Sequence, residues 1–181
     1  LDASLVRVGD VLIGVHSSGL HSNGYSLARR ALLDVAKYGF DQVVGGLGRT
    51  LGEELLEPTK IYSKAVQRAV TTGQVRAIAH ITGAGLPGNI PRVLPDGVGV
   101  TLDARRWPRP EIFSIIQAAG EIEEAEMRRT FNMGLGLVVV VAAQGADSVL
   151  SAFRDMGQAA DIVGEVVPSD AVDDDRVVFV G

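Results

Sequence analysis

Cysteine is absent from all 181 residues of this chain. Disulfide bonds, a thiolate nucleophile and a cysteine-based zinc site are therefore excluded from its chemistry. Long apolar runs are also missing. The run at residues 135–143 has the length of a buried strand, whereas a membrane-spanning helix needs about 20 apolar residues. No signal-peptide pattern is visible either, and we expect no membrane partner.

Positive charge is in the minority, with 17 lysine and arginine residues against 22 aspartate and glutamate residues and a net charge of −5. Proteins that bind nucleic acid need a basic face for the phosphate backbone, so we expect no nucleic-acid partner. A small anion of nucleotide size is not excluded, because backbone amides and one or two cations can hold it locally.

Apolar periodicity predicts alternating strands and helices along the whole chain. The predicted strands cover residues 11–15, 75–81, 97–102, 135–143, 162–167 and 176–180, and the predicted helices cover 25–37, 59–71, 90–94, 111–119, 121–129 and 147–156. Gly39 and Gly73 are expected to end the first two helices, and Pro58 to precede the second. No repeat or linker interrupts this order. We therefore predict one domain over residues 1–181, of the α/β (α+β) class, with a layered mixed sheet covered by helices.

The first informative loop joins the strand at 11–15 to the helix that begins at Tyr25. Its small, polar and flexible residues are Ser17, Ser18, Gly19, His21, Ser22, Asn23 and Gly24. Unpaired N–H groups and the positive end of a helix dipole make such a loop a candidate anion site. An ordinary turn with Ser22 or Asn23 as the helix N-cap fits the same residues, and both interpretations stay open on this evidence.

A second loop of the same kind follows the strand at 75–81, where His80 leads to Thr82, Gly83, Ala84 and Gly85. In layered α/β proteins, binding sites gather beyond the carboxyl ends of strands. We therefore predict that both loops lie at one edge of the sheet and share one concave surface, with Asn132 or Lys60 nearby.

Single residues of these loops have structural alternatives. His21 has no apolar face to fill and is predicted to contact substrate, while His16 is predicted to be structural and His80 fits either role. Lys60 is placed in the first turn of a helix, where a cation is unfavourable, which indicates an anionic partner. Asn132 is either a loop amide that reads a substrate group or a turn residue.

Two further features are predicted to be structural. The glycines at 45–48 follow no clear strand and are predicted to form a surface loop rather than a phosphate cradle. Glu124 and Arg128 lie one helical turn apart and are predicted to form a surface ion pair, so we assign no metal site.

Four segments together, at residues 14–30, 55–62, 75–95 and 129–134, carry a family resemblance. In their order and spacing the chain resembles phosphoribosylformylglycinamidine cyclo-ligase, the aminoimidazole ribonucleotide synthetase of purine biosynthesis. The resemblance fades over the last dozen residues. Two positions depart from the family pattern: Ala84 replaces a glycine and Gly88 replaces an acid. Alanine restricts positive φ, so the substrate geometry at this loop is in question.

This resemblance implies a carboxy-terminal domain with a partly ferredoxin-like fold that binds the ribonucleotide in an ATP-dependent cyclisation. The residues implied in substrate or phosphate binding are Ser17, Ser18, Gly19, His21, Ser22, Asn23, Gly24, Lys60, His80, Thr82, Gly83, Gly85 and Asn132. ATP and Mg²⁺ are implied to bind mainly on an amino-terminal domain whose motifs are absent from this chain. The resemblance further implies a cytoplasmic homodimer for the intact enzyme. We expect the chain alone to be inactive, and we assign no catalytic residue.

Other functions stay open beside this one. Within the same superfamily they are the amidotransferase-linked synthetase, selenophosphate synthetase, thiamine-phosphate kinase and a hydrogenase-maturation factor. The strings at 18–24 and 58–62 favour the cyclo-ligase. A non-catalytic anion-binding or dimerisation module is the alternative from another class. A triad hydrolase is disfavoured, because the chain has no Gly-x-Ser-x-Gly elbow.

Overall fold

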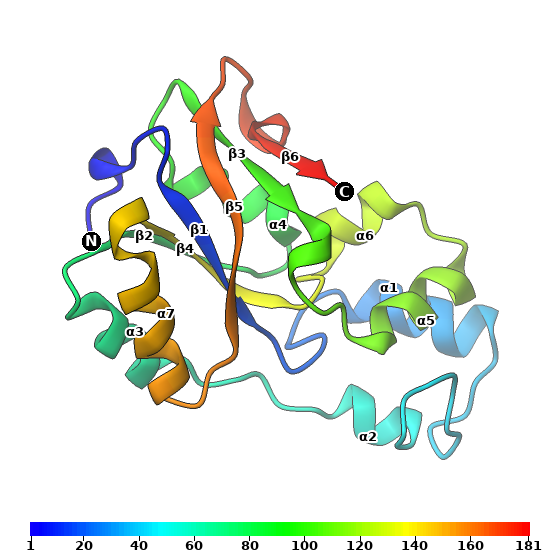
Figure 1. Ribbon diagram of the computed structural model, residues 1–181. Coiled ribbons are helices and arrows are strands. Elements are labelled where there is room, and N and C mark those ends of the chain that lie inside the picture. The colour runs from blue at the N-terminus through cyan, green and yellow to red at the C-terminus, as the bar shows by residue number, and fades with distance from the viewer.

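A computed structural model describes all residues 1–181. Its centre is a six-stranded mixed sheet of order β2-β4-β1-β5-β3-β6, with helices on both faces (Figure 1). The strands are β1 (Val11–His16), β2 (Val75–His80), β3 (Val98–Asp103), β4 (Leu135–Val141), β5 (Ala160–Pro168) and β6 (Val177–Val180). The predicted class, a layered mixed sheet covered by helices, is confirmed.

Strand direction determines where the two informative loops lie. β4 pairs antiparallel with β1 on one side and with β2 on the other, so β1 and β2 run in the same direction. Every residue of β4 is buried, as its valine-rich run predicts for a strand covered on both faces. The carboxyl ends of β1 and β2 therefore lie at the same edge of the sheet, as predicted.

The helices form two layers. They are α1 (Tyr25–Arg29), α2 (Leu51–Leu55), α3 (Ser63–Val70), α4 (Gly85–Asn89), α5 (Glu111–Gly120), α6 (Glu124–Thr130) and α7 (Ala146–Asp155). One core includes buried residues of α1, α4, α5 and α6, and Phe113 and Phe131 contact there with ring centroids 5.8 Å apart. The other core lies under α3 and α7 and includes Phe153. No helix is both long and apolar enough to cross a membrane.

Several predicted boundaries are wrong in ways that bear on the site. The helix at 59–71 begins only at Ser63, because Lys60 and Tyr62 instead reach out to the His16 carbonyl oxygen. Residues 56–62 are extended or turn-like and form a segment that we call the strap. The short helix predicted at 90–94 lies earlier, at α4, and a 3₁₀ turn follows it at Pro91–Val93.

Helix α2 was not predicted. Its signal is a capping box, in which the Thr50 side chain accepts from the Glu53 N–H and the Glu53 side chain accepts from the Thr50 N–H. The first helix changes to a π-helix at Arg30–Val35. Lys37, with φ 59°, adopts the left-handed conformation just beyond it, so the helix ends before the predicted stop at Gly39.

Candidate ligand-binding site

The two glycine-bearing loops meet beyond the ends of β1 and β2. A Cβ atom on Gly83 would lie 3.6 Å from Oδ1 of Asn23, so the tips of the two loops are neighbours. Asn23 forms no hydrogen bond through its side chain within the protein, and Gly83 is exposed. The predicted meeting of the loops is therefore confirmed, while their use by a ligand stays a prediction.

The helix that follows the first loop begins without a side-chain cap. Its N-cap residue is Gly24, with φ 75°, and a Cβ there would lie 2.6 Å from Cδ1 of Phe131. Ser22 does not cap the helix, since its hydroxyl contacts Thr59 Oγ1 at 3.1 Å. The ordinary N-cap interpretation is therefore wrong. The first N–H groups of α1 have no side-chain acceptor, which leaves them able to face an anion.

Asn132 joins the first loop to the loop before β4. Its Oδ1 accepts from the Ser17 hydroxyl at 3.0 Å and from the Gly134 N–H at 2.8 Å. Its Nδ2 donates to the Gly19 carbonyl oxygen at 2.8 Å. The residue is only 1% exposed. Asn132 and Ser17 thus face the protein and hold the loop in place, and direct reading of a substrate by Asn132 stays a prediction.

Asn89 holds the second loop in place from inside the protein, as Asn132 holds the first. This role was not predicted from the sequence. Its Oδ1 accepts from the Thr82 hydroxyl at 3.1 Å, and its Nδ2 donates to the Gly85 carbonyl oxygen at 2.7 Å. Asn89 is buried. The available signal was one amide within the otherwise apolar stretch 86–90, because a buried polar side chain needs partners.

His21 belongs to the first loop, and its side chain is buried. Its Nε2 accepts from the Ser18 N–H at 3.2 Å, and Nδ1 is buried with no partner. Burial lowers the pKa of the imidazole to about 4, with smaller contributions from His80 and Lys60. Next to it, burial raises the pKa of Tyr62, whose hydroxyl donates to the His16 carbonyl oxygen at 2.9 Å. His21 is therefore neutral near pH 7.

A pH titration tests this state of His21. Because its folded pKa, about 4, is below the unfolded value of about 6.5, the unfolded chain binds more protons between these values. Stability should therefore fall as pH falls, with His21 contributing a loss of about 2 kcal/mol between pH 7 and pH 5. Urea unfolding of the protein and of His21→Asn measures this loss. Asparagine tolerates the left-handed backbone that His21 adopts, with φ 58°. An equal pH slope in both proteins would contradict the assignment.

The remaining predicted residues lie around these loops. Lys60 is half-buried on the strap, its Nζ donates to the His16 carbonyl oxygen at 3.2 Å, and burial lowers its pKa. Ser18 donates through its hydroxyl to the Pro58 carbonyl oxygen at 2.7 Å. His80 is exposed at the end of β2. His16 contacts Asp161 through Nε2 at 2.8 Å, which agrees with the structural role predicted for it.

The two departures from the family pattern are coupled in space. Ala84 has φ −98°, so alanine fits there without backbone strain. Gly85, with φ 58°, is the position that needs glycine. A Cβ on Gly88 would lie 2.6 Å from the Ala84 methyl group. Alanine at 84 thus leaves no room for a side chain at 88.

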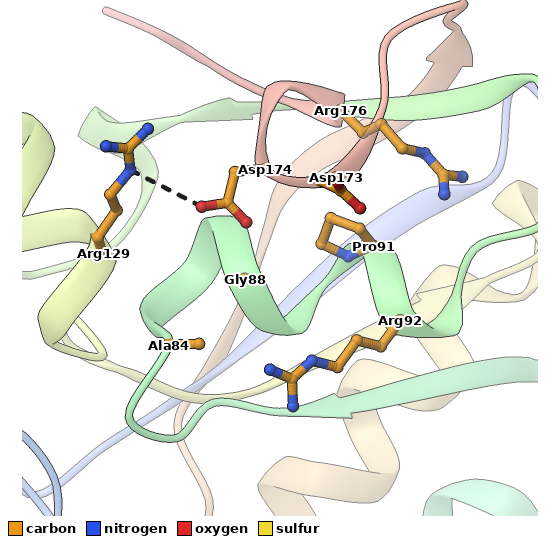
Figure 2. Close-up of a pocket in the computed structure, with 8 residues that line it drawn as sticks. All are labelled: Ala84, Gly88, Pro91, Arg92, Arg129, Asp173, Asp174 and Arg176. Atoms are coloured by element: carbon orange, nitrogen blue, oxygen red, sulfur yellow. Dashed lines mark ion pairs between the residues drawn. The ribbon is translucent and has the colours of Figure 1, made fainter.

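A hollow of about 690 Å³ lies on the far side of this loop, between α4 and the 3₁₀ turn at Asp173–Arg176 (Figure 2). Its lining residues are Ala84, Gly88, Pro91, Arg92, Arg129, Asp173, Asp174 and Arg176. Asp174 forms an ion pair with Arg129, at 3.7 Å from Nε, and Arg92 extends on the other side of α4 in Figure 2.

Outside this hollow, Glu124 and Arg128 form the predicted ion pair on α6, with 3.0 Å between Oε1 and Nε.

Comparison with known proteins agrees with this architecture. The chain is 50% identical over 182 aligned residues to the phosphoribosylformylglycinamidine cyclo-ligase of Sorangium cellulosum, covering 99% of this chain and 52% of that protein. It thus spans about half the length of this relative and of the cyclo-ligase of Anaeromyxobacter dehalogenans.

Two solved structures share the fold. A hydrogenase maturation protein of E. coli, HypE, matches with TM-score 0.63 and 20% identity, over 99% of this chain and 48% of that chain. T. maritima PurL complexed with ADP matches with TM-score 0.54 and 19% identity, over 93% of this chain and 23% of that chain. Residues 7–175 match the family described as AIR synthase related protein, C-terminal domain. The chain therefore belongs to this AIR synthase related family and corresponds to its carboxy-terminal domain.

Proposed function

We propose that this chain is the ribonucleotide-binding half of a phosphoribosylformylglycinamidine cyclo-ligase. The observation that carries the proposal is the meeting of two polar, glycine-bearing loops at one sheet edge, next to a helix start with no side-chain cap. The chain is 50% identical to about half of a cyclo-ligase, which supports this class of substrate. The whole enzyme would close the imidazole ring of formylglycinamidine ribonucleotide at the expense of ATP, in de novo purine biosynthesis.

The chain's own part in this reaction is binding and orientation. The substrate phosphate would accept from the first N–H groups of α1 and contact Ser22, Asn23 and the Gly83 backbone, with Lys60 as the nearby cation. A fixed set of amides around a phosphate needs no rearrangement when the ligand binds, which favours affinity. Asn132 and Asn89 would act as positioning residues, because each holds one loop from inside the protein.

ATP and Mg²⁺ are proposed to bind mainly on the half of the enzyme that this chain does not cover. In this chain no group of three or more histidine, aspartate or glutamate side chains lies close enough to hold a metal ion. PurL, which shares the fold, was solved with ADP. When bound, ATP would activate the formyl oxygen of the substrate as a phosphate leaving group. The homodimer and the cytoplasmic location are further parts of this proposal.

The Asn23 side chain offers a clean test of ribonucleotide binding. Since it makes no hydrogen bond within the protein, Asn23→Ala should leave the unfolding free energy within about 0.5 kcal/mol. The affinity for formylglycinamidine ribonucleotide should fall roughly fivefold to tenfold, which corresponds to one lost hydrogen bond. Calorimetric titration measures both proteins. Gly19→Val is a poorer test, because Gly19 has φ 146° and valine would strain the loop.

The control is Ser151→Ala, an exposed serine of α7 on the other side of the sheet, which should bind as the unchanged chain does. Inorganic phosphate is titrated in parallel. Equal, weak binding of phosphate and ribonucleotide, insensitive to Asn23→Ala, would replace the proposal by a non-catalytic anion-binding module.

A further inference from the structure

The strap at residues 56–62 runs between α2 and α3 along the lower margin of the molecule in Figure 1. Its polar groups face the first loop and the end of β1. The Pro58 carbonyl oxygen accepts from the Ser18 hydroxyl, Thr59 contacts Ser22, and Tyr62 donates to the His16 carbonyl oxygen. Arg49 adds an ion pair to Glu57 at 2.5 Å. These contacts fix the strap against the candidate site.

Two apolar side chains of the strap are exposed to solvent. Leu56 is 82% exposed and Ile61 is 83% exposed, more than any other large apolar residue of the chain. Because both side chains are largely exposed, they contribute little to the stability of this chain. Burying a leucine or isoleucine in full is favourable by roughly 1.5–3 kcal/mol. Two such residues on a fixed backbone beside a binding site fit an interaction surface better than a solvated loop.

We propose that Leu56 and Ile61 are the docking surface for the amino-terminal half that the full-length relatives carry. This inference rests on the proposed function, because it gives the ribonucleotide site its second wall. The cyclo-ligase of Sorangium cellulosum has about half its length outside the match to this chain, which provides an occupant of sufficient size. The strap contacts the first loop through Ser18 and Ser22, so a domain that binds the strap would close over the bound ribonucleotide from the side of Lys60.

The absence of cysteine makes the surface directly measurable. Ile61→Cys gives this chain a single thiol on the strap, and Val172→Cys gives a matched control. Val172 is 72% exposed and belongs to the segment between β5 and β6, at the opposite margin in Figure 1. The maleimide labelling rate of each thiol is measured by peptide mass spectrometry. It is measured in this chain and in a full-length chimera, in which the amino-terminal half of the Sorangium cellulosum cyclo-ligase precedes this chain.

We expect the Ile61→Cys thiol to label at least tenfold more slowly in the chimera than in this chain, and the Val172→Cys thiol to label equally fast in both. Adding Leu56→Asp should restore fast labelling at position 61 in the chimera. It should leave the melting temperature of this chain unchanged, because Leu56 contributes little to its own fold. Equal labelling of position 61 in the chimera and in this chain overturns the proposal. So does concentration-dependent protection in this chain alone, which would identify the occupant as a second copy.

Ring closure by the chimera is assayed separately, so that the two proposals fail independently. Turnover of formylglycinamidine ribonucleotide with a freely labelled position 61 would retain the proposed function and reject this docking surface. A protected position 61 in a chimera that binds no ribonucleotide would retain the docking surface and reject the proposed function.

Discussion

Gly85→Ala should destabilise the protein by about 4 kcal/mol, because two separate effects act at this position. The first is backbone strain, since Gly85 has φ 58°. The second is a collision, because a Cβ there would overlap the Arg128 carbonyl oxygen and lie 2.8 Å from the Arg129 carbonyl carbon. Both neighbours are backbone atoms of α6 and cannot rotate away. The loop or α6 must therefore shift, and ribonucleotide affinity should fall as well.

Gly97→Ala separates the two effects. Gly97 has φ 77°, and no atom lies within 4 Å of the position that a Cβ would occupy. Alanine at this position therefore brings the backbone strain without the collision. Its expected loss is about 1 kcal/mol. Urea unfolding followed by circular dichroism gives both values under one set of conditions. Similar losses in the two variants would show that the close approach of α4 to α6 is not what fixes the second loop.

Asn132→Ala should lose about 3 kcal/mol or more of unfolding free energy. The change leaves the Gly19 carbonyl oxygen, the Gly134 N–H and the Ser17 hydroxyl without their buried partner. Each unsatisfied buried group costs roughly 1–3 kcal/mol. The affinity for the ribonucleotide should fall at least tenfold although Asn132 is only 1% exposed, because the first loop loses its anchor.

Ser17→Ala is the graded comparison, since it removes one of the three hydrogen bonds. We expect a loss of about 1 kcal/mol and a correspondingly small change in affinity, measured by the same unfolding and titration experiments. If Asn132→Ala changed stability but left affinity intact, the amide would be a structural residue with no influence on the site.

Periodicity and loop chemistry were sufficient to predict the strands and a mixed sheet, but not the order of the strands in it. The valine run at β4 predicted a strand covered on both faces, and the repeated order of strand, glycine loop and helix predicted that the loops after β1 and β2 meet. The strap could not be predicted in this way, because apolar spacing at Ile61 and Tyr62 continues that of α3. Tertiary contacts hold this segment out of the helix: those of Tyr62 and Lys60 with His16, and those of Pro58 and Thr59 with the first loop.

The direction in which each loop side chain points could not be predicted from the sequence either. Ser17, His21 and Asn132 belong to the predicted set but are buried, whereas Asn23 and Gly83 lie at the loop tips. A residue type in a polar loop does not indicate whether it supports the loop or faces a ligand, since both roles use the same hydrogen-bonding groups. Asn89 was missed for the same reason, because its amide works entirely inside the fold.

The central claim is that the loops after β1 and β2 form one ribonucleotide surface. Amide chemical shifts of the labelled chain, followed during a titration with formylglycinamidine ribonucleotide, test it most directly. We predict that shifts at residues 18–24 and at residues 82–85 change together with one dissociation constant, and that inorganic phosphate reproduces only part of the change at the first loop. Shifts confined to one loop, or gathered around Arg92 and Arg129, would contradict the claim.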